Sequence, residues 1–241
     1  MLIAGRPVRF AGDQPDDTLG ERRLRAAYAT AGWPGVQIAL EPEAAGYRFV
    51  RGLTRPATVM IGDFGGGASD FSILRFDPGD DRRIKALGHA GIGIAGDTFD
   101  YRIIDKAISP RLGKGATYRL SGADLPAPPD WYSSFARWHQ LSLMRAPKMP
   151  RDIEAVARAA AHPERPHALL SLIREELGYA LYRAVSEVKA KLSRTETSVL
   201  RFAQAGFAIE ETIATQDFTD WIAPGIARIA ATVDLTLARR G

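Results

Sequence analysis

Two aspartates around three consecutive glycines, within residues 59–74, form the segment with the clearest chemical potential. Asp63 precedes Gly65, Gly66 and Gly67, and Asp70 follows them. Glycines can adopt φ > 0, so their N–H groups can converge on one anion. Two carboxylates would repel a phosphate unless a hydrated divalent cation lay between them, as Mg²⁺ does in phosphoryl-transfer sites. The segment therefore predicts a phosphate site served by Mg²⁺, although a glycine-rich turn closed by aspartates would use the same residues.

Strands are expected to position these side chains. The apolar run 59–61 and the alternating Phe71 and Ile73 predict a β-hairpin around the glycines. Residues 1–107 alternate strand and helix, which predicts an α/β layer fold. The expected elements are a strand near 2–9, a helix over 17–30 ended by Gly32, a strand over 36–40, a short helix from Glu43, the hairpin, a strand near 84–87 and a helix over 97–108.

The second half of the chain has a different character. Residues 121–130 are rich in proline, glycine and aspartate and predict a boundary loop. Residues 131–193 are mainly helical, and an apolar stripe from Leu169 to Leu192 predicts one long helix. Residues 198–202 and 207–213 predict a hairpin, and a final helix is expected from Thr215 to about residue 239.

Composition excludes several classes of site. The 241 residues include no cysteine, which excludes disulfides, thiolate catalysis and cysteine zinc sites and suggests a reducing, cytoplasmic setting. The formal charge of +4 is scattered along helices and mixed with acids, so no nucleic-acid partner is expected. No membrane partner is expected either, because no stretch approaches the length of apolar sequence that a membrane span needs.

Another glycine pattern offers an alternative. Gly91, Gly93 and Gly96 match the Gly-x-Gly-x-x-Gly fingerprint of dinucleotide-binding Rossmann domains, but Asp105 comes too early to hold a ribose. The four histidines show no metal-ligand spacing, and Gly-x-Ser-x-Gly is absent.

The glycine hairpin resembles the phosphate-binding hairpin of the actin-like ATPase superfamily, which includes actin, sugar kinases and DnaK-type chaperones. Further segments resemble the chaperones in the right order, and the spacer 135–139 is most similar to their YegD-like branch. These segments are 4–10, 40–47, 94–100, 188–193 and 215–218. The resemblance implies an α/β, ribonuclease H-like lobe with an inserted, mainly helical subdomain carrying a β-hairpin. The expected boundaries are 1–110 for the core, 111–213 for the insertion and 214–241 for a returning helix.

The resemblance also implies roles for individual residues. Asp63, Glu41 and Asp70 would be catalytic and would order the attacking water, with Asp63 holding Mg²⁺ through water. Gly65, Gly66, Gly67 and Gly96 would bind phosphate, and Lys189 and Ser193 would bind adenosine. Glu41 precedes Pro42 and is therefore expected to be extended. ATP or ADP and Mg²⁺ would be the cofactors, and unfolded or client proteins and co-chaperones would be partners of the intact protein.

Departures from the family pattern limit these implications. Ala68 stands where many members have threonine, and Ser186 stands where an adenosine-side acid is expected. The first phosphate hairpin and the closing adenosine loop are expected outside residues 1–241, so the chain alone is expected to bind nucleotide weakly and not to hydrolyse it. A non-catalytic interaction module on the same fold, or a sugar-kinase or filament-type relative, remains an alternative.

Overall fold

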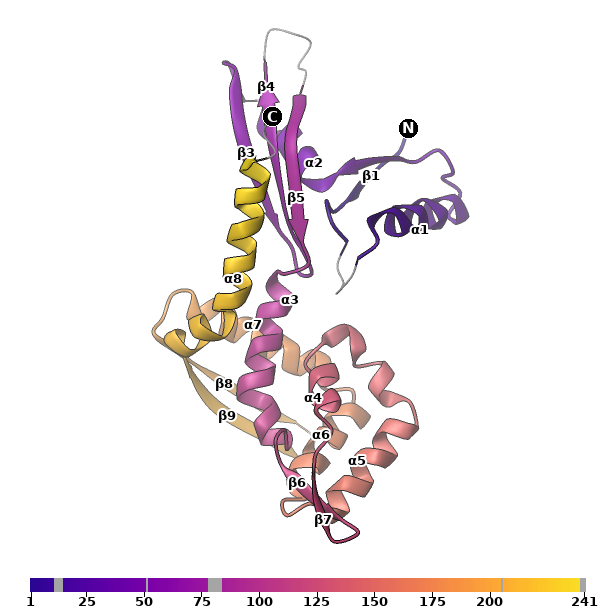
Figure 1. The fold of residues 1–241 in the computed structure, drawn as a ribbon, viewed down its shortest axis with the longest axis vertical. Helices are drawn as coiled ribbons and strands as arrows, with labels where there is room; N and C mark the ends of the chain where they lie inside the picture. The colour runs from indigo at the N-terminus through magenta and orange to yellow at the C-terminus, as the bar shows by residue number, and fades with distance from the viewer. Residues whose placement is uncertain (11–14, 51, 78–83, 205, 239–241) are drawn as a thin grey trace. The chain divides into compact units, whose positions relative to one another are not determined.

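The computed structural model describes residues 1–10, 15–50, 52–77, 84–204 and 206–238. The protein is mixed α/β with several small sheets (Figure 1). It divides into two compact units. Unit 1 comprises Met1–Thr98 with Pro224–Gly241, and unit 2 comprises Phe99–Ala223.

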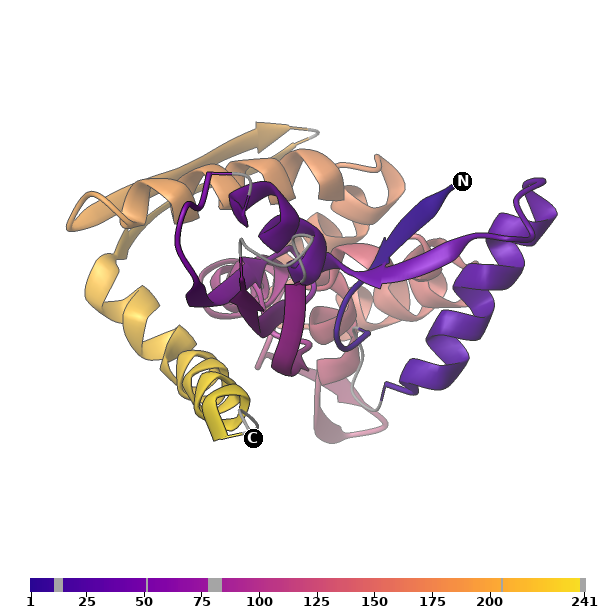
Figure 2. The ribbon, with the colours of Figure 1, turned by 90° about the horizontal axis from the view of Figure 1, so that it is seen from above.

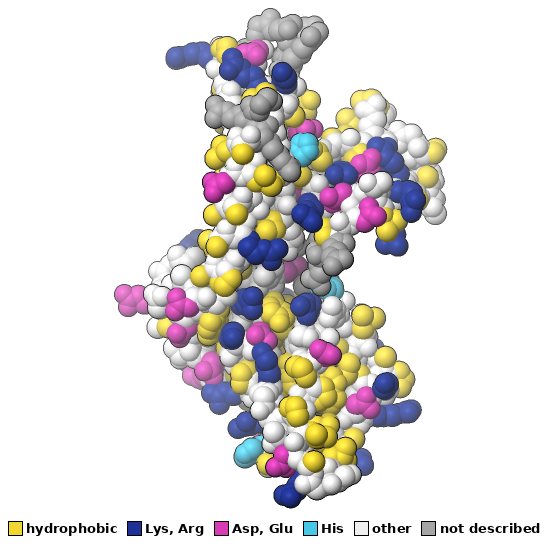
Figure 3. All heavy atoms as spheres, in the orientation of Figure 1, with side chains coloured by type: hydrophobic (Ala, Val, Ile, Leu, Met, Phe, Trp, Pro, Cys, Tyr) yellow, Lys and Arg dark blue, Asp and Glu magenta, His cyan; other side chains and the backbone are white. Residues whose placement is uncertain are grey.

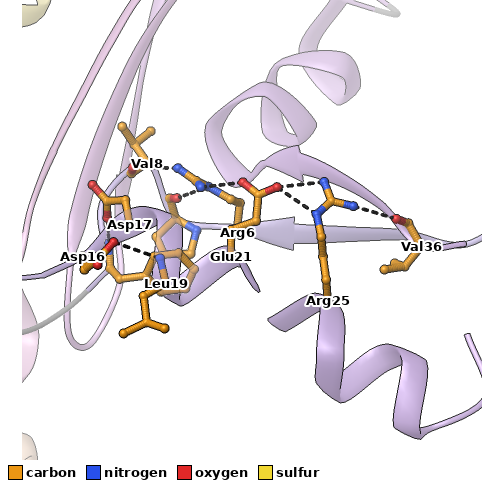
Figure 4. Close-up of polar contacts among 10 residues, drawn as sticks. Arg6, Val8, Asp16, Asp17, Leu19, Glu21, Arg25 and Val36 are labelled. Atoms are coloured by element: carbon orange, nitrogen blue, oxygen red, sulfur yellow. Dashed lines mark hydrogen bonds and ion pairs between the residues drawn. The ribbon is translucent and has the colours of Figure 1, made fainter. Parts of the chain in front are cut away.

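Unit 1 begins with a parallel βαβ arrangement. β1 (Ile3–Arg6) pairs with β2 (Gln37–Leu40), and α1 (Asp17–Thr30) connects them. The Asp16 side chain caps α1 by accepting from the Leu19 N–H. Glu21 of α1 bridges Arg6 at 2.7 Å and Arg25 at 2.8 Å (Figure 4). Because Arg6 lies in β1 and Arg25 also donates to the Val36 carbonyl just before β2, these contacts join α1 to the segments of both strands of the small sheet.

The second sheet of unit 1 carries the glycine hairpin. β3 (Ala57–Phe64), β4 (Ser69–Phe76) and β5 (Ile84–Ile92) are antiparallel, with β4 in the middle and buried along nearly its whole length. The hairpin expected within residues 59–74 is therefore present. The strand expected near 84–87 extends further, to Ile92. Helix α2 (Glu41–Val50) packs on the sheet through Gly46, whose missing Cβ leaves room for the Leu74 and Ile61 side chains.

Unit 2 is mainly helical. Its elements are the rest of α3 (Gly96–Ile103), the π-helical turn η1 (Ile104–Ile108), the 3₁₀ turn η2 (Ser109–Leu112), β6 (Thr117–Leu120), β7 (Ala123–Pro126), α4 (Pro129–Phe135), the 3₁₀ turns η3 (Trp138–Gln140) and η4 (Leu143–Arg145), α5 (Lys148–Ala159), α6 (Glu164–Arg174), α7 (Gly178–Leu192), β8 (Thr197–Gln204), β9 (Phe207–Ala214) and the start of α8 (Thr215–Ala238). β8 and β9 form the expected hairpin, which packs against α7 (Figure 2). The boundary loop expected at 121–130 was wrong in part, because β7 pairs with β6 inside it.

One hydrophobic core holds unit 2 together. It is built from fully buried side chains on most of its helices and on the β8–β9 hairpin. Representative members are Ile104, Phe135, Ile153, Leu169, Leu181, Val185, Leu200 and Ile213. The apolar stripe identified in the sequence therefore faces a core, as its period predicts.

The prediction of one long helix from Leu169 to Leu192 was wrong. α6 ends at Arg174 and α7 starts at Gly178. Between them Glu176 has φ 56°, the Glu176 N–H donates to the Ile173 carbonyl, and the Leu177 N–H donates to the Leu172 carbonyl. This pair of bonds is a Schellman motif, which ends a helix through one left-handed residue. The apolar period continues through the break because both helices face the same core.

Helix α8 overturns the expectation that no stretch approaches a membrane span. It is the single helix in the described ranges that is long and apolar enough to cross a membrane, by length and composition only. Figure 3 shows hydrophobic side chains along it, and Ile226, Leu235 and Leu237 are exposed. Alanines between these larger residues raise the mean hydropathy without forming an obvious apolar run. The helix starts at Thr215 as expected, whereas its expected end near residue 239 lies outside the described residues.

Candidate phosphate site at the glycine hairpin

The turn between β3 and β4 leaves two amide donors available. Asp63 and Asp70 are paired across the hairpin, and the Gly65 N–H closes the turn on the Ala68 carbonyl at 2.9 Å. Within the described part of the chain, the N–H groups of Gly66 and Gly67 have no protein acceptor. Both glycines are exposed. The turn can therefore offer two N–H groups to an anion.

The start of α3 is attached to this turn. The Gly96 N–H donates to the Gly65 carbonyl at 3.3 Å, and the Asp97 N–H donates to the Gly66 carbonyl at 2.8 Å. Ser69 adds a third connection, because its hydroxyl donates to the Ile94 carbonyl at 2.7 Å. Gly96 was expected to bind phosphate, but in the structure its N–H donates to the hairpin and so helps to hold the turn in place.

Asp70 is a buried anchor beside the turn. Its side chain is 3% exposed, and its Oδ1 accepts from the Arg9 N–H at 3.2 Å. Burial raises the pKa of Asp70 to about 6, and the charges of Glu41 and Asp63 act in the same direction, while hydrogen bonds from the Arg9 and Val8 backbone oppose the shift. The charges of Glu41 on α2 and Asp63 on β3 therefore both reach Asp70 on β4, so Asp70 connects the three acids that were expected to act together.

Glu41 is not extended, and that expectation was wrong. It is the first residue of α2, two residues before the expected start at Glu43. Pro42 is tolerated in this first turn because its missing N–H would have no helical partner there. The Glu41 side chain is exposed, and its Cγ lies 3.0 Å from where a Cβ on Gly5 would stand. The glycine in β1 thus makes room for this carboxylate.

The donor set fits Mg²⁺ in chemical type. Carboxylate oxygens are its preferred protein ligands, and Mg²⁺ commonly keeps several waters while it binds one or two carboxylates. Among the residues described, no three His, Asp or Glu side chains lie close enough together to hold a metal ion directly. Asp63 is half-buried on β3, so it could contact a hydrated ion through water, as the sequence resemblance implies.

The expected adenosine residues lie in unit 2 and have protein partners there. Lys189 pairs with Asp100 at 2.9 Å, and the Ser186 hydroxyl donates to the other Asp100 oxygen at 2.9 Å. The Ser193 hydroxyl donates to the Ala190 carbonyl at the end of α7. The sequence analysis did not identify Asp100 as the buried partner of Lys189 and Ser186, although Asp100 is the last residue of the segment 94–100 that resembles the chaperones.

Two other residues near the hairpin were missed or misread. Gly91 lies opposite Asp70 in the antiparallel β4–β5 pair, so the glycine pattern does not form the parallel βαβ turn that a Rossmann site requires. Asp97 was expected only as the start of a helix, and its contact with Gly66 depends on long-range folding that sequence spacing does not reveal. No family model matches the chain.

Proposed function

We propose that the chain is the ATP-binding lobe of an actin-like ATPase, related to the YegD-like branch of the DnaK-type chaperones. The observation that supports this function is a buried aspartate at the glycine turn whose pKa is raised in part by two further acids. Glu41, Asp63 and Asp70 come from three different elements, and the charges of Glu41 and Asp63 both act on Asp70. Such a cluster is costly to maintain unless a cation offsets it.

Each group has a distinct role in this proposal. The Gly66 and Gly67 N–H groups donate to the terminal phosphates of ATP or ADP. Asp63 and Glu41 would accept hydrogen bonds from the waters of a hydrated Mg²⁺ and from the attacking water, while Asp70 accepts from the Arg9 backbone N–H. Bound Mg²⁺ supplies positive charge that offsets both the acids and the phosphates. Hydrolysis belongs to the intact protein, because positioning of phosphate requires groups on more than one side.

The rest of the assignment comes from the sequence resemblance. Lys189 and Ser193 would contact adenosine, client proteins and co-chaperones would be partners of the intact protein, and the setting would be cytoplasmic. The segments 40–47 and 188–193 favour a chaperone relative over a sugar kinase or a filament protein.

A second candidate is a non-catalytic interaction module on the same fold. Ala68 supplies no hydroxyl beside the phosphate amides, and Lys189 is already paired with a buried carboxylate. Both features would weaken nucleotide binding without harming the fold.

Amide NMR of the full chain distinguishes the two candidates. Titration with Mg²⁺-ADP and Mg²⁺-ATP should shift the Gly66 and Gly67 signals and saturate in about the millimolar range, since two amide hydrogen bonds contribute only a few kcal/mol. Asp63→Asn should weaken binding, whereas Asp130→Asn, which alters an exposed acid of α4, should not. Absence of any shift at Gly66 and Gly67 at tens of millimolar nucleotide would reject the nucleotide site and favour the module.

A further inference from the structure

Asp97 contacts the glycine turn through both its backbone and its side chain. Its N–H donates to the Gly66 carbonyl at 2.8 Å. Its carboxylate oxygens lie 3.1 and 3.3 Å from where a Cβ on Gly66 would stand, so they rest against the Gly66 backbone. Any side chain at residue 66 would crowd this carboxylate. The turn therefore holds a negative charge against Gly66, one of the two residues whose N–H groups are available.

This charge affects which anions the turn can accept. A metal-free phosphate that bonded the Gly66 N–H would lie close to the Asp97 carboxylate, and the two like charges would repel. A phosphate that carries a divalent cation brings positive charge to the same place. Asp97 is half-buried, so solvent would screen the repulsion only in part.

Asp70 and Glu41 are less suited to this role. Asp70 is buried and directs its Oδ1 at the Arg9 N–H, and Glu41 leans on Gly5 of β1. Asp97 is the acid that lies directly against the donor residue itself. Because its backbone N–H makes the bond to Gly66, its side chain can be neutralised without removing the connection between α3 and the turn.

We infer that Asp97 is a specificity-determining residue, which makes the glycine turn accept phosphate bound to a divalent cation and discriminate against metal-free phosphate. This inference rests on the proposed function, since it assumes that Gly66 and Gly67 bind phosphate. It adds a residue that the sequence resemblance did not assign.

The test compares pyrophosphate binding with Mg²⁺ and with EDTA, using the full chain and the Gly66 and Gly67 amide signals as the readout. The wild-type protein should bind the Mg²⁺ complex more tightly. In Asp97→Asn the metal-free affinity should rise about fivefold or more, the factor expected for removing one like charge about 4 Å away in water. The preference for the Mg²⁺ complex should fall by the same factor. Asp130→Asn, at an exposed acid in the first turn of α4, serves as the matched control and should leave the preference unchanged.

Two further variants guard against a folding artefact. Asp97→Ser is neutral and suits a helix start, so it should reproduce the effect of Asp97→Asn. Asp97→Glu keeps the charge and should retain the preference for Mg²⁺. An unchanged preference in both neutral variants would overturn the role of Asp97 while the proposed function stands. Failure of pyrophosphate to shift Gly66 or Gly67 in the wild type and in every variant, with or without Mg²⁺, would overturn the proposed function and this inference with it.

Discussion

A Cβ added to Gly91 would overlap the Oδ1 atom of Asp70, the same atom that accepts from the Arg9 N–H. The added Cβ would also lie 3.0 Å from the Arg9 nitrogen. Gly91 and Asp70 are paired across β4 and β5, whereas Arg9 follows β1. Three chain segments therefore meet at one buried carboxylate, and they can do so because residue 91 has no side chain.

Gly91→Ala should destabilise unit 1. The methyl group would have to displace Asp70 or the Arg9 backbone, and overpacking of this kind costs about 1–3 kcal/mol. Urea unfolding followed through the amide signals of β3, β4 and β5 measures the loss. Gly35→Ala is the matched control, since nothing lies within 4 Å of its added Cβ. Equal stability of the two variants would contradict the close packing at Asp70.

Asp70 should also make stability depend on pH. Its pKa is about 6 in the folded protein, against about 3.9 for an unfolded chain. The folded state thus favours the neutral carboxyl, so this group stabilises the fold most below pH 4, and its contribution declines as pH rises through 6. The decline amounts to at most about 3 kcal/mol.

The comparison for this prediction is Asp70→Asn, whose amide oxygen can still accept from the Arg9 N–H. Urea unfolding in EDTA between about pH 4 and pH 7.5 should show the wild-type protein losing stability relative to the variant as pH rises. A constant difference between the two proteins across this range would show that Asp70 ionises normally.

The sequence predicted elements better than it predicted contacts. The glycine hairpin, α1 and the β8–β9 hairpin follow from local periodicity and turn residues, and all three are present. The break between α6 and α7 was missed because Glu176, rather than glycine, adopts the left-handed conformation there. Gly178, at the start of α7, is the sequence signal that could have predicted the break. The start of α2 was misplaced because a rule about the residue before proline was applied at a helix start, where proline is well tolerated.

At the candidate site too, the sequence predicted individual residues better than it predicted the contacts between them. Asp63 and Asp70 could be selected from the sequence because they flank the three glycines within a few residues. Arg9 and Gly91 could not be connected to Asp70, since their contacts depend on strand register and on the path of β1, which no local pattern specifies. The Asp100–Lys189 pair joins α3 to α7 over a long sequence separation for the same reason.

Lys189→Ala should destabilise unit 2 in the absence of any nucleotide. Asp100 is buried, and loss of Lys189 would leave its charge without that cationic partner, although the Ser186 hydroxyl would still donate to it. Breaking a buried pair from one side costs about 3 kcal/mol or more. Lys191→Ala is the control and should have little effect, because Lys191 is exposed and lies two residues further along α7.

Urea unfolding followed through amide signals of α7 and β8 measures this loss. Asp100→Asn/Lys189→Ala should recover part of it, because the uncompensated charge is removed. Wild-type stability in Lys189→Ala would mean that the pair contributes nothing to folding, and would leave the lysine available for a binding role alone.

A substitution at the α6–α7 junction is expected to increase stability, in contrast to the substitutions above. Glu176 has φ 56°, a conformation that glycine adopts without strain, and it occupies the position of a Schellman motif where glycine is preferred. Glu176→Gly should therefore raise the free energy of unfolding of unit 2 by about 0.5–1 kcal/mol, because relief of the left-handed strain exceeds the extra backbone entropy that glycine loses. The ion pair with Arg145 that it removes is exposed on both sides and should contribute little. Glu175→Gly is the matched control. Residue 175 has φ −84°, which is not left-handed, so the same substitution there should lower the free energy of unfolding of unit 2. If both variants lose stability equally in urea, the left-handed residue does not set the boundary between α6 and α7, and the Arg145 contact or the packing of Leu177 must hold the junction instead.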